Sequence, residues 1–516
     1  MIMDVSIRPV LLFVVVLCLV KHFTKKRHRL PLPPGPAPLP IVGNVRGINK
    51  NAPWLTYKDW GDRYGDLVYS RMLNQEIVVV NSETIAKDLL EHRSSNYSDR
   101  PEIVTSDLCG VGFNTVLMRY GPRWRLHRRL FHQAFRPEAA VHWRSMQLRK
   151  ARQLLVNIAE EPNNFFAHIQ THSSAIMMSA VYDYESAPRG DSLIALVEKA
   201  MKTVVAEVRP EVTAVFNAFP CLLKLPACFP GMAIKKTAVM TTKWVNEWVE
   251  RPFQHVQRHR AAGTAGPSMV SNSFSKVTDG GETTHMINAI KESAATALGG
   301  ITSSSLLTFV LAMVLYPEVQ ARAQAAIDAV VGTERLPNFD DRSSLPYIDA
   351  VLRETLRWHP VLPLAIPHAA IESDTYQGYH IPAGATIIPN VWAMSHNEAK
   401  YPNPSEFRPE RFFDANGELN DDTMSMAFGC VGRYFADASL WSAVALLLAT
   451  FKFSKAKDPE GNVINFEPKW SSGIASHLLP FPCSISPRLH RFPVERLRSE
   501  PHGQHSRVKS VELNVE

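Results

Sequence analysis

The sequence predicts a mainly α-helical protein with a smaller β lobe, and three observations support this fold class. Helical periodicity dominates from Ser82 to about Val256. A long, mostly apolar run from His285 to Leu315 is stopped by Pro317 and reads as one helix. Short strand-like runs occur near both ends of this helical body. The remaining elements that we expect are helices at 54–64, 318–331 and 345–358, strands at 67–70, 76–80, 375–381 and 386–389, and a surface loop at 262–284.

Size and composition are those of a globular protein. The chain has 516 residues, of which 45% are hydrophobic and 20% charged, and no low-complexity linker divides its middle. The net charge of +7 is spread along the chain, so we expect no nucleic-acid partner. The six cysteines form no CxxC pair and no regular spacing, which argues against a disulfide framework or a zinc site and favours a reducing compartment.

The N-terminal segment predicts a membrane anchor. An apolar run at 9–20 is followed by a basic flank at 21–29. This order favours a retained anchor over a cleaved signal peptide, and it places the rest of the chain in the cytosol, most simply at the endoplasmic reticulum membrane. The apolar run is shorter than the ~18–20 residues that span a bilayer comfortably. We therefore expect an anchor with its flank at 1–29, a Pro-rich hinge at 30–44, a catalytic domain at 45–498 and a polar tail at 499–516.

Cys430 is the first candidate functional residue. It lies between Gly429 and Gly432, directly before an apolar run at 436–451 that reads as a buried helix. Backbone N–H groups and the positive end of a helix dipole favour a thiolate at such a position. A thiolate offered by a tight loop is a good axial ligand for haem iron. The alternative interpretation is a buried structural cysteine.

Two further segments carry charged side chains at helical spacing. Glu354 and Arg357 lie on one face of an apolar helix, which suggests a shielded ion pair that Arg411 could share; the alternative is an ordinary surface pair. Trp124 and Arg128 are separated by one helical turn and could both reach one ligand carboxylate. The alternative for this second segment is an exposed basic helix, and the same basic face could dock an acidic electron donor.

Taken together, these motifs resemble the cytochrome P450 haem-thiolate monooxygenases, in particular membrane-bound fungal enzymes of specialised metabolism. The resemblance covers nearly the whole chain and includes the basic-flanked anchor and the Pro33–Pro36 hinge. It implies a cytochrome P450-like fold, a haem b ligated by Cys430, and an NADPH-dependent cytochrome P450 reductase as partner. It further implies that Trp124, Arg128 and His368 contact the haem propionates, and that Glu354, Arg357 and Arg411 form a stabilising network behind the cysteine loop.

The cysteine loop departs from the family pattern Phe-x-x-Gly-x-Arg-x-Cys-x-Gly. Without a gap, the Phe, Gly and Arg of the pattern fall on Thr423, Met426 and Phe428, and all three fail. With a gap, Phe428-Gly429 matches the opening of the loop and Cys430-Val-Gly432 its end. About five residues are then absent, among them the propionate-binding Arg and the glycine of the bulge that presents the sulfur to the iron. Backbone N–H groups bonded to that sulfur would tune the reduction potential of the iron. The clean flanks suggest a local deletion or an error in the gene model.

The long helix departs from the family as well. Gly299-Gly300 supplies the glycine-rich kink, but no Asp or Glu directly precedes the alcohols that follow it. Thr302 is the best candidate for the catalytic alcohol and Ser303 the next, and without an acid their proton relay would depend on water. The alternative role for Thr302 is a hydroxyl bonded back to its own helix.

The predicted reaction inserts one oxygen atom of O2 into an apolar small molecule, in secondary-metabolite biosynthesis. Cys430 is the predicted haem ligand, and Thr302 and Ser303 are the predicted catalytic alcohols. Substrate contacts are expected from the largely apolar segments 101–113, 206–219 and 472–479. Two alternatives follow from the departures. The shortened loop suggests a haem-deficient protein that keeps only the fold. The missing acid suggests a haem-thiolate isomerase or dehydratase that needs no reductase.

Overall fold

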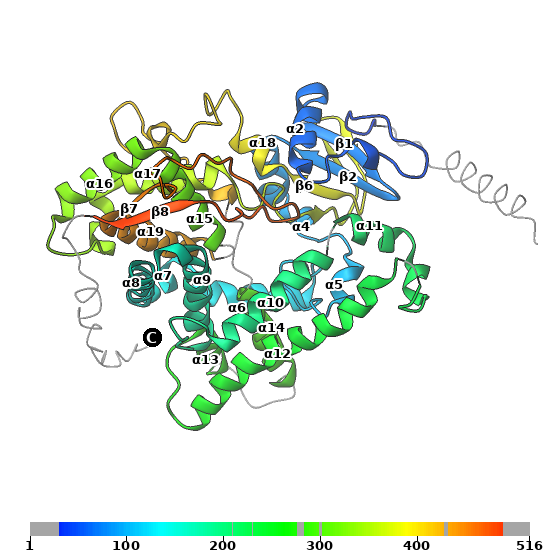
Figure 1. Cartoon of the computed structure of the whole chain (residues 1–516). Helices are drawn as coiled ribbons and strands as arrows, with labels where there is room; N and C mark the ends of the chain where they lie inside the picture. The colour runs from blue at the N-terminus through cyan, green and yellow to red at the C-terminus, as the bar shows by residue number, and fades with distance from the viewer. Residues whose placement is uncertain are drawn as a thin grey trace, which may run out of the picture.

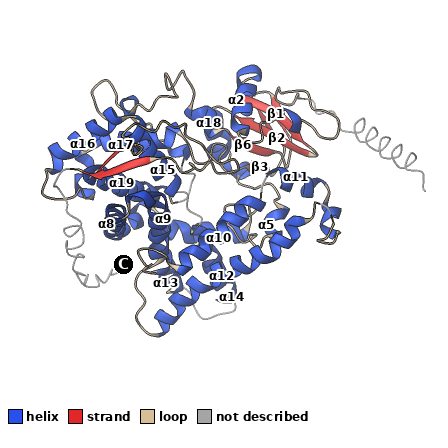
Figure 2. Cartoon of the chain, in the orientation of Figure 1, coloured by secondary structure: helices blue, strands red, loops and turns tan. Residues whose placement is uncertain are grey.

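The computed structural model describes residues 30–208, 210–229, 231–275, 283–298, 302–427 and 432–488. Helices make up most of this part of the chain, and the strands form small sheets at its margins (Figure 2). The predicted anchor at 1–29 and the tail at 499–516 lie outside the described residues, as do Gly299, Gly300 and Cys430.

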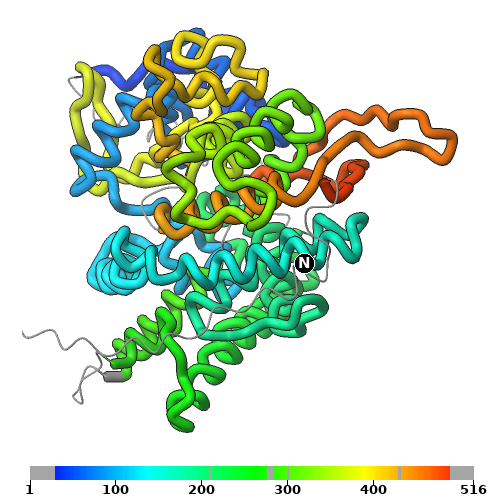
Figure 3. Tube along the Cα trace, turned by 90° about the vertical axis from the view of Figure 1, so that its left-hand side faces the viewer, coloured from blue at the N-terminus to red at the C-terminus, as the bar shows by residue number. Residues whose placement is uncertain are grey.

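The β lobe joins the two ends of the body, as predicted. Its four-stranded sheet has the order β1-β2-β6-β3. β2 pairs with β1 antiparallel and with β6 parallel, so residues near 78 lie beside residues near 387. Figure 3 shows these blue and yellow segments together at the top of the molecule. The strands of this sheet are β1 (Leu67–Met72), β2 (Gln75–Val80), β3 (His368–Ala369) and β6 (Thr386–Pro389).

Residues 375–381 form a hairpin and not one continuous strand. β4 (Asp374–Tyr376) and β5 (Tyr379–Ile381) are antiparallel neighbours joined by Gln377 and Gly378. Both turn residues have positive φ, 49° and 80°, as a two-residue hairpin turn requires. A further antiparallel pair, β7 (Phe451–Lys455) with β8 (Cys483–Pro487), was not predicted.

Two helices form the centre of the helical body. In α15 (Thr302–Leu315) every side chain from Ser304 to Val314 is buried, and α19 (Arg433–Thr450) is buried from Ala438 onward. α19 packs against α15, α8, α16 and α17 (Figure 1). The prediction of a buried helix after the cysteine loop is therefore confirmed. The other helices are α2 (Pro53–Tyr64), α3 (Glu83–Lys87), α4 (Ser94–Tyr97), α5 (Val104–Leu108), α6 (Pro122–Phe135), α7 (Pro137–Ala140), α8 (Arg144–Glu160), α9 (Phe165–Tyr182), α10 (Ser192–Glu207), α11 (Pro210–Ala218), α12 (Ala233–Ala261), α13 (Met269–Phe274), α14 (Thr283–Ala297), α16 (Pro317–Val331), α17 (Pro346–Trp358) and α18 (Val391–Ser395).

The segment 262–284, expected to be a surface loop, contains the short helix α13. The Ser268 side chain caps this helix by accepting the Ser271 backbone N–H at 3.1 Å. Met269 and Val270 are buried in the helical core. Tertiary burial of two apolar residues thus stabilises a helix that the polar composition of the segment conceals.

In the search of the described residues, one stretch, Thr284–Leu315, is long and apolar enough to cross a membrane, although 299–301 within it are not described. However, 73% of its most apolar window is buried inside the protein, which is typical of a core helix. This stretch takes in α14 and α15, the two pieces of the long helix predicted at 285–315.

Candidate active site

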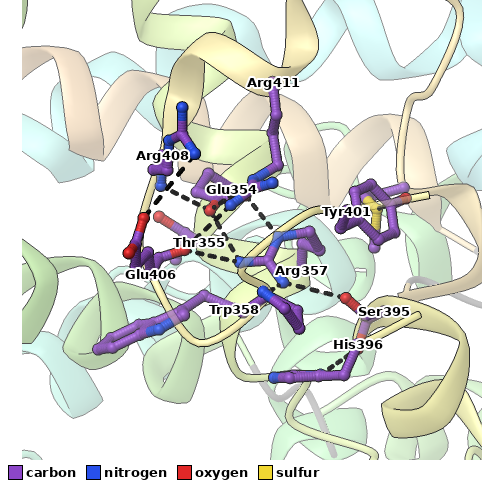
Figure 4. Close-up of polar contacts among 12 residues, drawn as sticks. Glu354, Thr355, Arg357, Trp358, Ser395, His396, Tyr401, Glu406, Arg408 and Arg411 are labelled. Atoms are coloured by element: carbon purple, nitrogen blue, oxygen red, sulfur yellow. Dashed lines mark hydrogen bonds and ion pairs between the residues drawn. The ribbon is translucent and has the colours of Figure 1, made fainter. Parts of the chain in front are cut away.

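The predicted ion pair on α17 is completely buried. Glu354 and Arg357 are both 0% exposed and form a two-pronged contact, with Arg357 Nε donating to Glu354 Oε2 at 2.6 Å and Nη2 to Oε1 at 2.8 Å. Arg411 Nε also donates to Glu354 Oε1, at 3.1 Å, and so does the Arg408 backbone N–H, at 2.7 Å (Figure 4). The surface alternative is therefore wrong.

The rest of the Arg357 guanidinium is also satisfied. It donates to the backbone carbonyls of Ser395, Pro404 and Glu406 at 2.9–3.1 Å. A buried charge is tolerated only when it is paired and its hydrogen bonds are complete. This network ties α17 to the segment 395–411, which leads toward the cysteine loop.

Trp124 and Arg128 lie one turn apart on α6, as predicted. The Arg128 guanidinium lies 5.5 Å from the centre of the Trp124 ring, and both side chains are half-buried. α6 begins with Pro122 at its first position, where the missing N–H of proline costs nothing. The centre of the Tyr120 ring lies 5.2 Å from the centre of the Trp124 ring.

The cations around α6 differ in their partners. Arg119 pairs with Asp99 at 2.8 Å, and Arg123 pairs with Glu292 at 2.7 Å. Among the described residues, Arg128 has no carboxylate partner and the Trp124 indole N–H has no acceptor. Two half-buried donors on one helix face, without an acceptor in the described protein, fit a ligand that brings its own carboxylates.

His127 on α6 has a structural role in this region. It is fully buried, and its Nδ1 lies 2.8 Å from the Thr115 hydroxyl. Its Nε2 lies 3.3 Å from a Glu292 carboxylate oxygen on α14. His127 therefore fastens α6 to α14 and points away from solvent.

His368 lies on β3, at the edge of the four-stranded sheet. Its Nδ1–H donates to the Tyr97 carbonyl at 2.7 Å, which leaves Nε2 for another partner. Burial, together with the positive charge of Arg100, lowers the pKa of His368 to about 3. The imidazole is therefore neutral in the structure as it stands.

Asp99 connects β3 with the start of α6, and sequence reasoning missed it. Its backbone carbonyl accepts the Ala369 N–H at 2.8 Å, next to His368. Its carboxylate accepts hydrogen bonds from Arg119 at 2.8 Å and from the Tyr120 backbone N–H at 2.7 Å. Burial opposes ionisation of Asp99, but these hydrogen bonds outweigh it and hold its pKa below the ordinary value. Nothing in the sequence near Asp99 signals this role, because its partners lie 20 and 270 positions away.

The alcohols at the start of α15 differ in their surroundings. Thr302 and Ser303 are half-buried, and within the described residues, which do not include 299–301 just before them, the Thr302 hydroxyl shows no hydrogen-bond partner. Thr308, one turn and a half further along, does bond back to its helix, donating to the Ser304 carbonyl at 2.9 Å.

The predicted substrate segments 101–113 and 206–219 lie against each other. The Thr105 hydroxyl on α5 and the Thr213 hydroxyl on α11 are 2.6 Å apart. Asn217 on α11 donates to the Glu102 carbonyl at 2.5 Å. Behind them, an apolar cluster joins this region to Ala295 on α14.

Comparison with known proteins identifies the family. The profile described as Cytochrome P450 matches residues 33–479. The chain belongs to the cytochrome P450 family. Similar proteins include the cytochrome P450 monooxygenase claR of Ampulloclitocybe clavipes, 38% identical over 94% of this chain and 91% of the relative. Another is the cytochrome P450 monooxygenase ARMGADRAFT_974139 of Armillaria gallica, 37% identical over 94% of this chain and 98% of the relative. A third is the cytochrome P450 monooxygenase COX1 of Coprinopsis cinerea, 34% identical over 93% of this chain and 96% of the relative.

The family defines the class of the enzyme and of its cofactor. The chain is a cytochrome P450 monooxygenase, and the family uses a haem-thiolate group, a redox partner and a small-molecule substrate. The donor pair on α6 is consistent with such a group, because haem carries two propionates. Cys430, the predicted ligand, lies outside the described residues; α19 begins after it, at Arg433, with Gly432 at the N-cap in the left-handed conformation (φ 77°).

Proposed function

We propose that this cytochrome P450 binds haem b through the thiolate of Cys430 and oxidises an apolar small molecule with O2. The observation that carries the proposal is the donor pair Trp124 and Arg128, which has no acceptor among the described residues and suits a propionate. In the sequence, Cys430 comes three residues before the first residue of α19, and a cysteine that precedes a helix N-terminus is favoured as a thiolate.

Side chains from α6 and β3, the two elements that Asp99 connects, would hold the two propionates. Arg128 and Trp124 donate from α6, and His368 approaches from β3. Because Nδ1–H of His368 already donates to Tyr97, Nε2 binds a carboxylate only when it also carries a proton. A carboxylate placed beside Nε2 raises the pKa of the imidazole. It thereby favours the protonated Nε2 that its own hydrogen bond requires.

The haem supplies the activation of dioxygen when it is bound, and the protein supplies orientation and protons. Thr302 is our candidate for steering protons, because its hydroxyl has no partner among the described residues, and Ser303 is the second candidate. No acidic residue precedes them, so water would deliver the protons. We infer that the electrons come from an NADPH-dependent cytochrome P450 reductase.

We propose an apolar substrate from the composition of the predicted substrate segments. α5 and α11 contribute few charges and pack on apolar clusters that include Val111, Phe216 and Ala295. A pocket lined by these segments would favour an apolar ligand that is oriented by few polar contacts. We place the reaction in fungal secondary metabolism, and the protein at the endoplasmic reticulum membrane through its N-terminal apolar run.

The first experiment is a ferrous carbon monoxide difference spectrum of the protein in membranes, recorded beside the Cys430→Ala variant. We expect the red-shifted Soret band of thiolate ligation in the wild type and its loss in the variant. A wild-type band typical of a neutral ligand, or no band, would contradict the proposal and favour the haem-deficient alternative. The transcript across 428–430 would then be sequenced.

The dependence on electrons is tested separately. Product formation in membranes is compared with and without NADPH and reductase. We expect turnover only when both are present. Turnover without them would identify the isomerase or dehydratase alternative instead.

A further inference from the structure

The segment Lys469–Leu479 forms a small hairpin near the C-terminal end of the described chain. Trp470 pairs with Leu478, the Ser471 N–H donates to the His477 carbonyl at 2.8 Å, and the Leu479 N–H donates to the Lys469 carbonyl at 2.8 Å. The returning strand of this hairpin is the segment 476–479. It is anchored to two other elements by neighbouring residues.

Ser476 anchors one face of this strand. Its backbone N–H donates to the Val361 carbonyl at 2.8 Å, and its hydroxyl lies 3.0 Å from Nε2 of His359. His359 follows α17 directly and stacks on Trp470 at the start of the hairpin. Burial lowers the pKa of His359 to about 3, so this imidazole acts as a neutral hydrogen-bonding group.

His477 anchors the opposite face, since consecutive side chains of an extended strand point to opposite sides. Its Nδ1 lies 2.5 Å from the hydroxyl of Ser304, and the hydroxyl or the ring N–H donates according to the tautomer. Ser304 is 3% exposed and lies in the first turn of α15, two positions after Thr302. Burial also lowers the pKa of His477, which keeps this contact neutral.

The hairpin is therefore placed between the two elements that lead to the proposed haem side chains. On one side is α15 with Thr302 and Ser303, and on the other is the segment after α17 that runs to His368. A shift of the hairpin relative to α15 changes the space beside Thr302. The Ser304–His477 contact is the side-chain hydrogen bond that the described residues show between the hairpin and α15.

We propose that His477 is a positioning residue for substrate selection. Through its hydrogen bond to Ser304, it sets the place of the Lys469–Leu479 hairpin over the start of α15. The place of the hairpin then determines which substrate shapes fit into the proposed substrate chamber beside Thr302. The identity of the chamber rests on the proposed function. The hydrogen bond itself touches neither substrate nor cofactor, so its effect is on shape selection and not on the bond-breaking step.

The variants separate the hydrogen bond from simple packing. Ser304→Ala removes the hydroxyl. His477→Asn keeps a polar atom at the position of Nδ1, whereas His477→Gln moves the amide to the position of Nε2. The matched control is Ser273→Ala on α13, which removes another buried hydroxyl that donates only within its own helix, to Met269 at 2.7 Å. If Ser304→Ala does not accumulate, His477→Gln carries the test.

The probes are imidazole, which needs little space, and 4-phenylimidazole, which extends across the chamber; both are titrated by the spectral shift of the ferric haem. In Ser304→Ala and His477→Gln we expect the ratio of the two Kd values to change by about fivefold, or about 1 kcal/mol, which is the loss of one hydrogen bond. His477→Asn and Ser273→Ala should keep the wild-type ratio. An unchanged ratio in both disrupting variants, or the same change in His477→Asn, would overturn the proposal.

A second measurement does not depend on haem. Hydrogen exchange of the peptide covering 469–479 should be faster in Ser304→Ala and His477→Gln than in the wild type and in His477→Asn. Equal exchange in all four proteins would show that the contact does not position the hairpin. If the wild type lacks a thiolate-type carbon monoxide spectrum, the proposed function fails, while this exchange measurement still decides whether His477 holds the hairpin.

Discussion

Glu354 accepts hydrogen bonds from three residues on two segments of the chain, α17 and the stretch 408–411. It accepts hydrogen bonds from Arg357 on its own helix, from the Arg408 backbone and from the Arg411 side chain. None of these interactions is exposed enough for water to replace a lost partner, because Glu354 and Arg357 are both 0% exposed. Breaking a buried pair leaves an uncompensated charge, whereas an exposed pair is replaced by water at little cost.

The variant Glu354→Gln tests this difference. It keeps the side-chain shape but removes the charge that compensates Arg357, so we expect a loss of about 3 kcal/mol or more in the free energy of unfolding. Lys58→Gln is the control, because it breaks an exposed helical pair with Asp62 and should change stability by less than about 0.5 kcal/mol. Thermal and denaturant unfolding followed by circular dichroism measure both. Equal losses of unfolding free energy in the two variants would show that the buried Glu354–Arg357 pair is no more important for stability than an exposed pair.

Asp99 gives a pH-dependent prediction at the same scale. Its pKa is lower in the folded protein than in the unfolded chain, so its ionised form stabilises the fold above the unfolded pKa of about 3.9. This contribution is lost as the pH falls through the lower, folded pKa. Asp99→Asn should therefore lower Tm at neutral pH, and the difference from the wild type should shrink below about pH 4. Melting curves at several pH values check this, and a Tm difference that stays constant down to pH 3 would contradict it.

At the scale of elements, α6 carries cations with a carboxylate partner and, within the described residues, one half-buried cation without such a partner. Arg123 and His127 both contact Glu292 on α14, while Arg128 and Trp124 occupy a half-buried face without an acceptor in the described chain. Helical periodicity was enough to place Trp124 and Arg128 together. It was not enough to identify the pairing of the other cations, because Asp99 and Glu292 come from distant parts of the sequence.

Arg128→Gln is expected to weaken haem retention. A charge-assisted hydrogen bond contributes about 1.5–3 kcal/mol, so the rate of haem loss should rise by about tenfold or more. Arg129→Gln is the matched control, since Arg129 is the next residue on α6 and is exposed. Transfer of haem to an apoprotein acceptor measures both rates. Similar rates in the two variants would show that Arg128 does not hold a propionate.

Other elements show the limits of local signals. The strands β1, β2 and β6 and the helices α2, α16 and α17 lie within a few residues of their predicted positions, because each has a strong periodic or β-branched pattern. α13 was missed, because its apolar content is two residues that become stable only when buried. The β4–β5 hairpin was predicted without its turn, because Gln377 is not a residue that usually adopts a positive φ.

At the scale of the whole molecule, Asn390 connects distant parts of the β lobe. It is 0% exposed and donates to the Trp54 carbonyl at 3.0 Å and to Asn81 Oδ1 at 2.9 Å. Its own Oδ1 accepts the Ala393 N–H at 3.2 Å. One side chain thus joins the start of α18 to α2 and to the residue after β2, both of which lie more than 300 positions earlier in the chain.

Asn390→Asp tests this connection with almost no change of shape. The carboxylate cannot donate, so two buried acceptors lose their partner, and each unpaired group costs about 1–3 kcal/mol. We expect a clear fall in Tm and faster proteolysis of the β lobe. Asn51→Asp, at an exposed position, is the control and should behave like the wild type. Unchanged stability of Asn390→Asp would show that the lobe does not depend on this residue.

The sequence by itself determined the mainly α fold with its β lobe, the apolar helix that contains α15, the buried α19, and the helical spacing of Glu354 with Arg357 and of Trp124 with Arg128. These patterns act between residues that are near in the chain. Only the tertiary structure decided that Glu354 and Arg357 are shielded, that Asp99 links α6 to β3, and that Ser304 meets His477. These contacts join residues far apart in sequence, and their energies depend on burial, which exists only once the chain has folded.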